Sequence, residues 1–357
     1  MARTKQTRIS RRAFLARSAA GAAAAAGLAW PRTGSAASPE VVVGHWGGAG
    51  PKVIRTAIFP DLQAKFPTAK LFIREGGDQD RKAMLQANPT NPEIDVLYVS
   101  NTDAKQMTRD GLTDPPNPQA VPEFANLYPI AQDGAYGVYL HAIALIYDPE
   151  KVKSPPTSWL DLWKPEYRNR VLVPNTKTAV NQAFVTAVVR ALGGSERKEK
   201  DVEEARKKLL ELRSNVVVFH TGTSQALTVI KSGDAWLGVA VAGYAYGAKD
   251  KGQSVDVAYP KEGALGAIDY MTVARHSKNK DLAHAYINLA LGRKAQKDFV
   301  EEVYWGPTNK TVEVSPKARE RAVIGEDAVK KLINPDWDYL VTVRSEWTDW
   351  WDKNMGK

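Results

Sequence analysis

The residues of this chain that could do chemistry are few and widely spaced. None of the short motifs of nucleophilic, zinc-dependent or nucleotide-dependent catalysis occurs: there is no G-x-S-x-G, H-E-x-x-H, Walker A or G-x-G-x-x-G pattern. The chain has no cysteine, which excludes disulfides, thiolate metal sites and cysteine nucleophiles. Five histidines lie far apart, each more typical of a packed or surface histidine than of a metal ligand: His45, His141, His220, His276 and His284. We therefore expect no enzyme, no metal and no other cofactor.

Polar or glycine-rich stretches follow several predicted strands. The stretch "WGGAG" (46–50) could form an anion-binding nest of backbone N–H groups, although we favour a tight turn from strand to helix. The stretch "HTGTSQ" (220–225) places Thr221, Thr223 and Ser224 at a strand end, where a ligand cleft would lie. Lys177 lies in a threonine-rich loop and could meet an anionic group, or could be an ordinary solvated lysine.

Short apolar or β-branched runs alternate with helical patterns along the chain, which predicts an α/β fold with largely parallel sheets. We expect strands at residues 40–46, 70–76, 94–100, 139–148, 170–175, 216–220, 235–243, 255–260 and 268–274. We expect helices at 52–66, 80–88, 158–163, 179–192, 197–213, 281–292 and 294–304, with a loop at 111–137. The tryptophans of "EWTDWWDK" (346–353) have helical spacing and predict a final helix that docks on the rest of the chain.

The first 37 residues predict an export signal. Arg11 and Arg12 precede an uncharged, alanine-rich run that is too short to span a bilayer, and small residues follow at 35–37. The order Arg-Arg-x-Phe-Leu resembles a twin-arginine signal. The alternative is a basic amphipathic helix or arm. We expect cleavage near Ala37 and a soluble protein in the periplasm.

Net charge argues against a nucleic-acid partner. The formal charge of +9 is carried mostly by the predicted signal, because residues 1–37 hold seven basic residues and no acidic one. Removing these seven from the 49 basic residues leaves 42 against 40 acidic ones, a charge near +2. Such a balance gives no electrostatic reason to bind a polyanion.

Chain length predicts two domains, since about 320 residues exceed one typical core. No linker rich in Pro, Ser or Gly separates two halves of the chain. A two-domain protein without a linker is expected to cross between its lobes more than once.

Three stretches of the sequence resemble periplasmic solute-binding proteins of ABC importers, in particular the spermidine/putrescine-binding group. They are "SPPTSWLDLWKPEYRNRVLVPN" (154–175), "VDVAYPKEGALGAIDYMTVARHSKNKDLAHAYINLAL" (255–291) and "WGPTNK" (305–310). The resemblance implies a two-lobed, type II-like binding-protein fold that traps a small molecule between its lobes and delivers it to an inner-membrane permease. It implies a monomer with one lobe at 38–141 and 266–305, and the other at 142–265 and 306–357. Hinges are expected near 138–144, 264–268 and 305–308.

The resemblance also implies a ligand-binding set. Family positions fall on these residues of the chain: Trp46, Ser100, Thr102, Thr176, Thr178, Asp269 and Trp305. Aromatic or acidic residues of the polyamine binders are replaced at Ala49, Thr102, Thr176, Ala179, Val241 and Ala267. Asp269 stands in an apolar strand, where a carboxylate needs a partner. One carboxylate with several hydroxyls suits a ligand with one amine, or a zwitterion, better than a long tri- or tetra-amine.

Several alternatives stay open from the sequence. Within the same class the ligand could be ferric iron, a phosphonate, thiamine or an opine. Iron sites favour tyrosines and carboxylates, and the candidates would be Tyr136, Tyr139, Tyr244 and Tyr246. Outside the class, an exported enzyme without a recognised motif is the remaining alternative.

Overall fold

The computed structural model describes residues 39–176 and 178–356. The predicted export signal, its cleavage site and Lys177 lie outside these residues. Within the described part of the chain, no helix is both long and apolar enough to cross a membrane.

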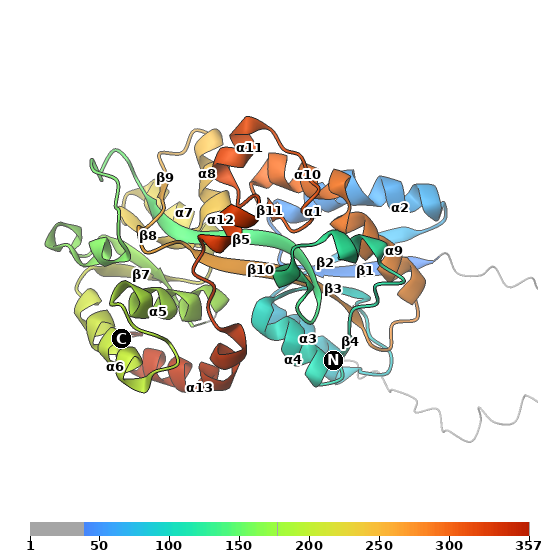
Figure 1. The fold of residues 1–357 in the computed structure, drawn as a ribbon, viewed down its shortest axis with the longest axis horizontal. Helices are drawn as coiled ribbons and strands as arrows, with labels where there is room; N and C mark the ends of the chain where they lie inside the picture. Colours follow the sequence, from blue (N-terminus) through green and yellow to red (C-terminus); the bar gives the residue numbers. More distant parts are fainter. Residues whose placement is uncertain (1–38, 177, 357) are drawn as a thin grey trace, which may run out of the picture. The chain divides into compact units, whose positions relative to one another are not determined.

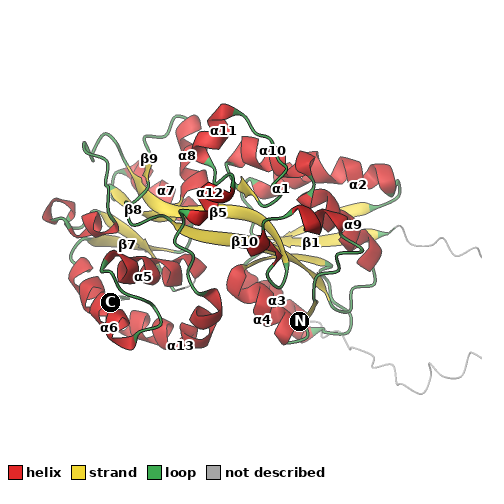
Figure 2. Ribbon diagram, in the orientation of Figure 1, coloured by secondary structure: helices red, strands yellow, loops and turns green. Residues whose placement is uncertain are grey.

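A single sheet of 11 strands runs through the described residues, with helices against both of its faces (Figure 2). Its main path has the order β2-β1-β3-β10-β5-β8-β6-β7; off this path, β4 pairs with β10, and β9 and β11 pair with β5. The strands are β1 (Glu40–His45), β2 (Lys70–Glu75), β3 (Val96–Ser100), β4 (Thr113–Asp114), β5 (Tyr136–Tyr147), β6 (Val171–Pro174), β7 (Val216–His220), β8 (Leu237–Val241), β9 (Asp256–Ala258), β10 (Leu265–Ala274) and β11 (Gly306–Pro307).

Pairing directions divide the sheet into three parts. Strands β2, β1 and β3 are parallel to one another, as are β7, β6 and β8, so the predicted parallel pairing holds in both outer groups. The long central strands β5 and β10 instead pair antiparallel with each other and with their outer neighbours. Parallel neighbours need a crossover, which the intervening helices supply.

The helices confirm the α/β prediction. They are α1 (Gly50–Val53), α2 (Phe59–Lys65), α3 (Asp78–Ala87), α4 (Asn101–Arg109), α5 (Ala179–Ala191), α6 (Glu199–Leu212), α7 (Thr223–Ser232), α8 (Ala242–Asp250), α9 (Lys280–Leu291), α10 (Arg293–Val303), α11 (Pro316–Arg321), α12 (Glu326–Lys330) and α13 (Trp337–Asn354). Sequence patterns missed α4 and α8, which begin directly after strands, α7, which begins three residues after β7 ends, and also α11 and α12.

Two large cores form on either side of the crossing strands, so the predicted two-lobed fold is confirmed. The first lobe packs β1–β3 with α1–α4, α9 and α10, and its core includes Ile54 and Phe299. The second lobe packs β6–β8 with α5, α6 and α13, and its core includes Trp159 and Trp351. The elements of each lobe gather at opposite ends of β5 and β10 (Figure 1). Val323 and Val329 pack in the first core, although the predicted boundaries place 306–357 wholly in the second lobe.

The strands β5 and β10 connect the lobes. In β5, residues 136–143 pair with β10, whereas residues 143–147 pair with β8 of the second lobe. The short strand β11 pairs with β5 at Leu140 and Tyr139. The three segments predicted as hinges are therefore neighbours within one sheet.

Two single residues, Pro60 and Ser158, show how local sequence shapes the helices. Pro60 does not end the helix predicted at 52–66; a π-helical turn at Ile54–Ile58 precedes it, and α2 continues to Lys65. Ser158 caps the short helix that the sequence predicts at 158–163, because its hydroxyl accepts a hydrogen bond from the Leu160 N–H at 3.1 Å. That helix, Trp159–Trp163, is a 3₁₀ helix.

Candidate functional site

A cleft of about 970 Å³ lies between the two lobes. First-lobe residues from the ends of β1, β2 and β3 form one wall, and second-lobe residues from the starts of α5 and α7 form the other. Residues of β5 and β10 form its floor. Its volume is within the range of small-molecule sites, and it follows the rule that ligands bind beyond the carboxyl ends of parallel strands.

The structure brings most of the predicted site residues together. Those that line the cleft are Trp46, Ser100, Thr176, Thr178 and Asp269, together with Thr221 and Thr223 of the threonine-rich stretch. Thr102 and Trp305 lie elsewhere. Thr102 is 2% exposed, in the first turn of α4. Trp305 is 3% exposed, and its ring packs 4.8 Å from that of Tyr139 and 5.7 Å from that of Phe299. Trp305 thus supports the cleft from the first core.

Asp269 sits at the centre of the floor. It lies in β10, where its backbone pairs with Ser100 of β3 on one side and with Tyr139 of β5 on the other. The pairing with β5 has a bulge between Asp269 and Tyr270. Nε2 of His141 is 2.8 Å from Oδ2 of Asp269, so the Nε2–H tautomer donates to this carboxylate. The side chain of Asp269 remains 23% exposed, which leaves its charge available to a ligand.

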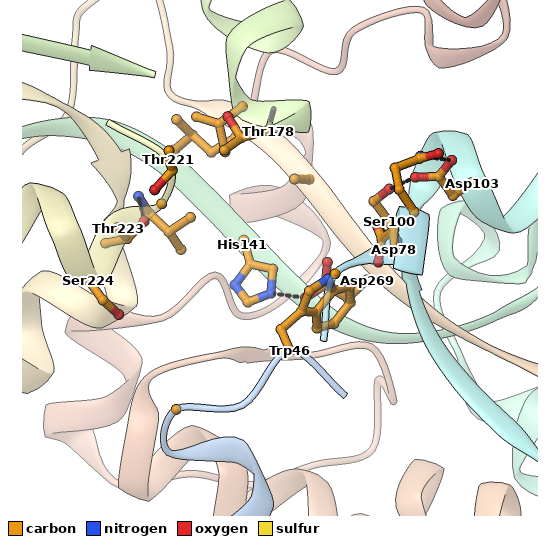
Figure 3. A pocket seen from close by; sticks show the side chains of 18 of the residues that line it. Trp46, Asp78, Ser100, Asp103, His141, Thr178, Thr221, Thr223, Ser224 and Asp269 are labelled. Atoms are coloured by element: carbon orange, nitrogen blue, oxygen red, sulfur yellow. Dashed lines mark hydrogen bonds and ion pairs between the residues drawn. The ribbon is translucent and has the colours of Figure 1, made fainter. Parts of the chain in front are cut away.

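Two further carboxylates lie beside Ser100. The Ser100 backbone N–H donates to Asp78 Oδ2 at 3.3 Å, and the Ser100 hydroxyl donates to Asp103 Oδ2 at 3.2 Å. Asp78 begins α3 and Asp103 lies in the first turn of α4. In Figure 3 these carboxylates and Asp269 occupy one side of the cleft. The site therefore holds more acidic groups than the single one predicted.

Arg81 holds Asp78 in place through an ion pair. Its guanidinium donates to Asp78 Oδ1 and to the Gly76 carbonyl, each at 2.5 Å, and lies 5.0 Å from the centre of the Trp46 ring. The arginine is 1% exposed. A cation between a carboxylate and an aromatic face holds both in place. Trp46 is thereby kept half-buried at the cleft wall.

Burial alters the acid–base behaviour of two groups here. It raises the pKa of Asp78 to about 6, against the opposing effect of Arg81, and the nearby charges of Asp103 and Asp269 add to the rise. Burial, with the charge of Arg81, lowers the pKa of His45 to about 3. His45 is therefore neutral at physiological pH, and its Nδ1 accepts the Gly47 N–H at 3.0 Å.

Hydroxyl groups line the opposite wall. Thr178, Thr221, Thr223 and Ser224 face the carboxylates across the cleft (Figure 3). Thr178 is the N-cap residue of α5, and the other three surround the start of α7. Neither helix has an acidic residue in its first turn. The N-terminal N–H groups and dipoles of α5 and α7 are therefore not offset by an acidic residue in either first turn, so this wall favours an anionic group.

The stretch "WGGAG" is the strand-to-helix turn that we favoured. β1 ends at His45 and α1 begins at Gly50, while Gly47 and Gly48 adopt φ of 94° and 71°. Both glycines line the cleft. Gly50 lets the turn close: a Cβ there would be 2.3 Å from His45 Cε1 and 3.2 Å from the Trp305 ring.

Replacing Gly50 by alanine should therefore destabilise the fold. Neither buried ring can move aside freely, and we expect a loss of about 1–3 kcal/mol in the free energy of unfolding. The matched control is Gly247→Ala in α8, where an added Cβ meets nothing within 4 Å. A helical glycine replaced by alanine should gain about 0.5–1 kcal/mol. Urea unfolding of both variants tests this, and equal effects would contradict it.

The site residues that sequence reasoning missed are Asp78, Asp103, His141 and Arg344. Asp78 and Asp103 follow β2 and β3 closely in the sequence, so the rule for parallel strand ends could have found them. His141 was interpreted as a packed or surface histidine, whereas it lines the cleft. No local sequence pattern indicates that Arg344, which lies in α13, would line the cleft.

The tyrosines considered for iron do not assemble into a site. Of the four, Tyr244 lines the cleft, whereas the Tyr136 hydroxyl accepts the Asn117 N–H at 2.6 Å and Tyr246 packs near Tyr304. Among residues 39–176 and 178–356, no group of three or more His, Cys, Asp or Glu side chains is arranged to hold a metal ion.

Comparison with known proteins identifies the family. Residues 91–343 match the family described as bacterial extracellular solute-binding protein. The spermidine/putrescine-binding periplasmic protein of Escherichia coli (strain K12) is 30% identical over 194 residues. That match spans 53% of this chain and 53% of the relative, about half its length.

Two other relatives extend the similarity along the chain. The gamma-aminobutyric acid-binding protein of Pseudomonas aeruginosa is 26% identical over 304 residues, which cover 83% of this chain and 85% of the relative. The crystal structure of an ABC transporter protein from Clostridium perfringens superposes with a TM-score of 0.73 at 25% identity, covering 88% of this chain and 99% of the other. The resemblance read from the sequence is confirmed.

Proposed function

Because this chain belongs to the bacterial extracellular solute-binding protein family, we propose that its cleft captures a small amine-bearing solute for an ABC permease. The bound solute carries one ammonium group, and an anionic group at its other end. Binding makes and breaks no covalent bond.

The observation that carries this proposal is the opposite polarity of the two cleft walls. Asp78, Asp103 and Asp269 present carboxylates on the first-lobe side. On the second-lobe side, α5 and α7 present helix N-termini without acidic residues. An ammonium would pair with the carboxylates, beside the face of Trp46, while a carboxylate or similar anion would accept N–H and O–H donors opposite.

A long polyamine is the second candidate, favoured by the spermidine/putrescine-binding relatives. It would place a cationic group near the N-termini of α5 and α7, where the helix dipoles disfavour positive charge. The gamma-aminobutyric acid-binding relative is matched over a longer part of both chains, and its ligand is a small zwitterion. We therefore favour a zwitterion over a tri- or tetra-amine.

The same proposal covers the cellular setting. We propose export by the twin-arginine route to the periplasm, cleavage near Ala37, and delivery of the solute to an inner-membrane permease. Closure would bend β5 and β10, which connect the lobes. We also propose that the monomer is the working form.

Thermal unfolding of residues 38–357 against a panel of solutes tests the proposal. The panel holds 4-aminobutanoate, 1,4-diaminobutane, spermidine, an opine, an aminophosphonate, thiamine and Fe³⁺. A ligand at about 100 times its dissociation constant adds about 2.7 kcal/mol, a readily measured shift. We expect the zwitterions to stabilise the protein most. A shift with Fe³⁺ or spermidine alone would overturn the proposal.

The affinity for an ammonium ligand should depend on pH. Protonation of Asp78 removes a negative charge from the cleft, so we expect affinity for 4-aminobutanoate to fall at least about threefold from pH 7 to pH 5. Binding near pH 6 should release a proton, because the ammonium favours the charged carboxylate. Calorimetry in two buffers of different ionisation enthalpy measures this release. An affinity that is flat across this range would contradict the role of Asp78.

The same shift predicts the effect of pH on stability. The pKa of Asp78 is raised above its usual 3.8 in the folded protein. Its stabilising contribution to the free energy of unfolding is therefore fully present below pH 4 and is lost as pH rises through 6. Ligand binding and stability should thus respond to pH in opposite directions between pH 4 and 6. This contrast separates the effect of Asp78 on the cleft from general acid unfolding.

A further inference from the structure

The three buried or partly buried carboxylates of the cleft do not have equivalent partners. Asp78 bonds to Arg81, and Asp103 lies 3.4 Å from Nη1 of Arg344. Asp269 bonds to His141 and, within residues 39–176 and 178–356, forms no salt bridge with an arginine. Asp80 also lines the cleft, but it is exposed at the rim, where water screens its charge.

The two arginines differ in how firmly they are held. Arg81 is 1% exposed and belongs to the first lobe, where it is fixed by its bonds to Asp78 and Gly76. Arg344 is 35% exposed and belongs to α13, whose Trp347 and Trp351 pack in the second core. Its guanidinium therefore crosses from the second lobe to reach Asp103 on the first. Nearby, Asp338 of α13 pairs with Lys105 of α4 at 3.0 Å, so α13 and α4 are in contact beside the cleft.

We infer that Arg344 is a specificity-determining residue, a built-in cation that occupies Asp103 and restricts the cleft to solutes with one ammonium group. This inference rests on the proposed function and adds to it the reason for discriminating against diamines. With Arg81 and Arg344 in place, two of the three carboxylates are paired with a cation, and Asp269 is left for the ammonium of the solute. A second ammonium would have to displace Arg344 from Asp103 or remain unpaired.

The test compares two solutes of equal length that differ in one terminal charge, 4-aminobutanoate and 1,4-diaminobutane. The variant Arg344→Gln removes the competing cation and frees Asp103. We expect the ratio of their dissociation constants to shift at least about tenfold in favour of the diamine. Arg344→Lys, which keeps the charge, should retain most of the natural preference. Calorimetric titration gives both constants for each variant.

Two controls separate charge at this position from other effects. Arg109→Gln removes an arginine of α4 that is 58% exposed and pairs with Asp338 but does not line the cleft, so it should leave the ratio unchanged. In the double variant Arg344→Gln with Asp103→Asn, the balance of charge is restored, and the ratio should return toward that of the natural protein. This second variant also tests the inference if Arg344→Gln alone is poorly folded.

The outcomes distinguish the inference from the function on which it rests. If the natural protein binds 4-aminobutanoate and Arg344→Gln leaves the ratio unchanged, the inference is wrong and the proposed function stands. An equal shift in Arg109→Gln would also overturn the inference, because it would show a general effect of net charge. If the natural protein binds neither solute, the inference and the proposed function are both wrong.

Discussion

Asp269→Asn is expected to bind 4-aminobutanoate at least about tenfold more weakly than the natural protein, a loss of about 1.4 kcal/mol or more. The substitution removes the negative charge at the centre of the cleft floor, where the ammonium of the solute would lie. It keeps the size of the side chain and a hydrogen-bonding group for His141. We therefore expect the melting temperature of the free protein to change little, and the loss to appear in calorimetric affinity alone.

The matched control for this variant is Asp114→Asn. Asp114 lies in β4, beside the same strand β10, and its side chain is 24% exposed against 23% for Asp269. It pairs with Lys280 at 2.6 Å and does not line the cleft. The control should retain the natural affinity. Equal losses in the two variants would show that Asp269 acts through the sheet rather than on the solute.

The fold was largely predictable because its signals are local. Buried β-branched runs such as 170–175 and amphipathic runs such as 197–213 each have one period that fits one element. The helices α4 and α8 were missed because each begins at the residue after a strand, and α7 was missed although it begins three residues after β7 ends. The antiparallel pairing of β5 and β10 was also not predictable, because it depends on how the chain crosses between lobes.

The site was predicted only in part, and the physical reason differs between its residues. Asp269 was chosen from the resemblance, supported by the argument that a carboxylate in an apolar strand needs a partner, and it lines the cleft. Trp305 was chosen by the same resemblance, but a tryptophan is as well suited to a core as to a cleft, and here its ring packs in the first core. Arg344 was missed because the contact that brings it to Asp103 joins residues 241 apart along the chain, which no local pattern reveals.

The two lobes differ in the charge at the helix N-termini that face the cleft. On the first lobe, Asp78 and Asp103 lie in the first turns of α3 and α4 and offset the positive ends of those helices. The second lobe has no such side chains at α5 and α7. A solute with an anionic end can take the place that acidic residues occupy in the first lobe. An acidic residue introduced into the first turn of α7 should therefore change which solute the cleft prefers.

Ser224→Asp tests this directly, and it should change stability and affinity in opposite directions. Ser224 is the second residue of α7, is exposed and lines the cleft. An aspartate in the first turn should stabilise the free protein by about 0.3–1 kcal/mol. It should also weaken binding of 4-aminobutanoate at least about tenfold, because it occupies the wall expected to hold the carboxylate of the solute. Affinity for 1,4-diaminobutane should stay the same or rise.

The control is Thr228→Asp, which adds the same charge to the same helix. Thr228 is exposed, lies beyond the first turn of α7 and does not line the cleft. It should leave both affinities close to those of the natural protein, and it should not gain the stability of an acid in the first turn. If Ser224→Asp weakened binding of the zwitterion and the diamine equally, the effect would be one of shape. An anionic group of the solute would then have to lie elsewhere in the cleft.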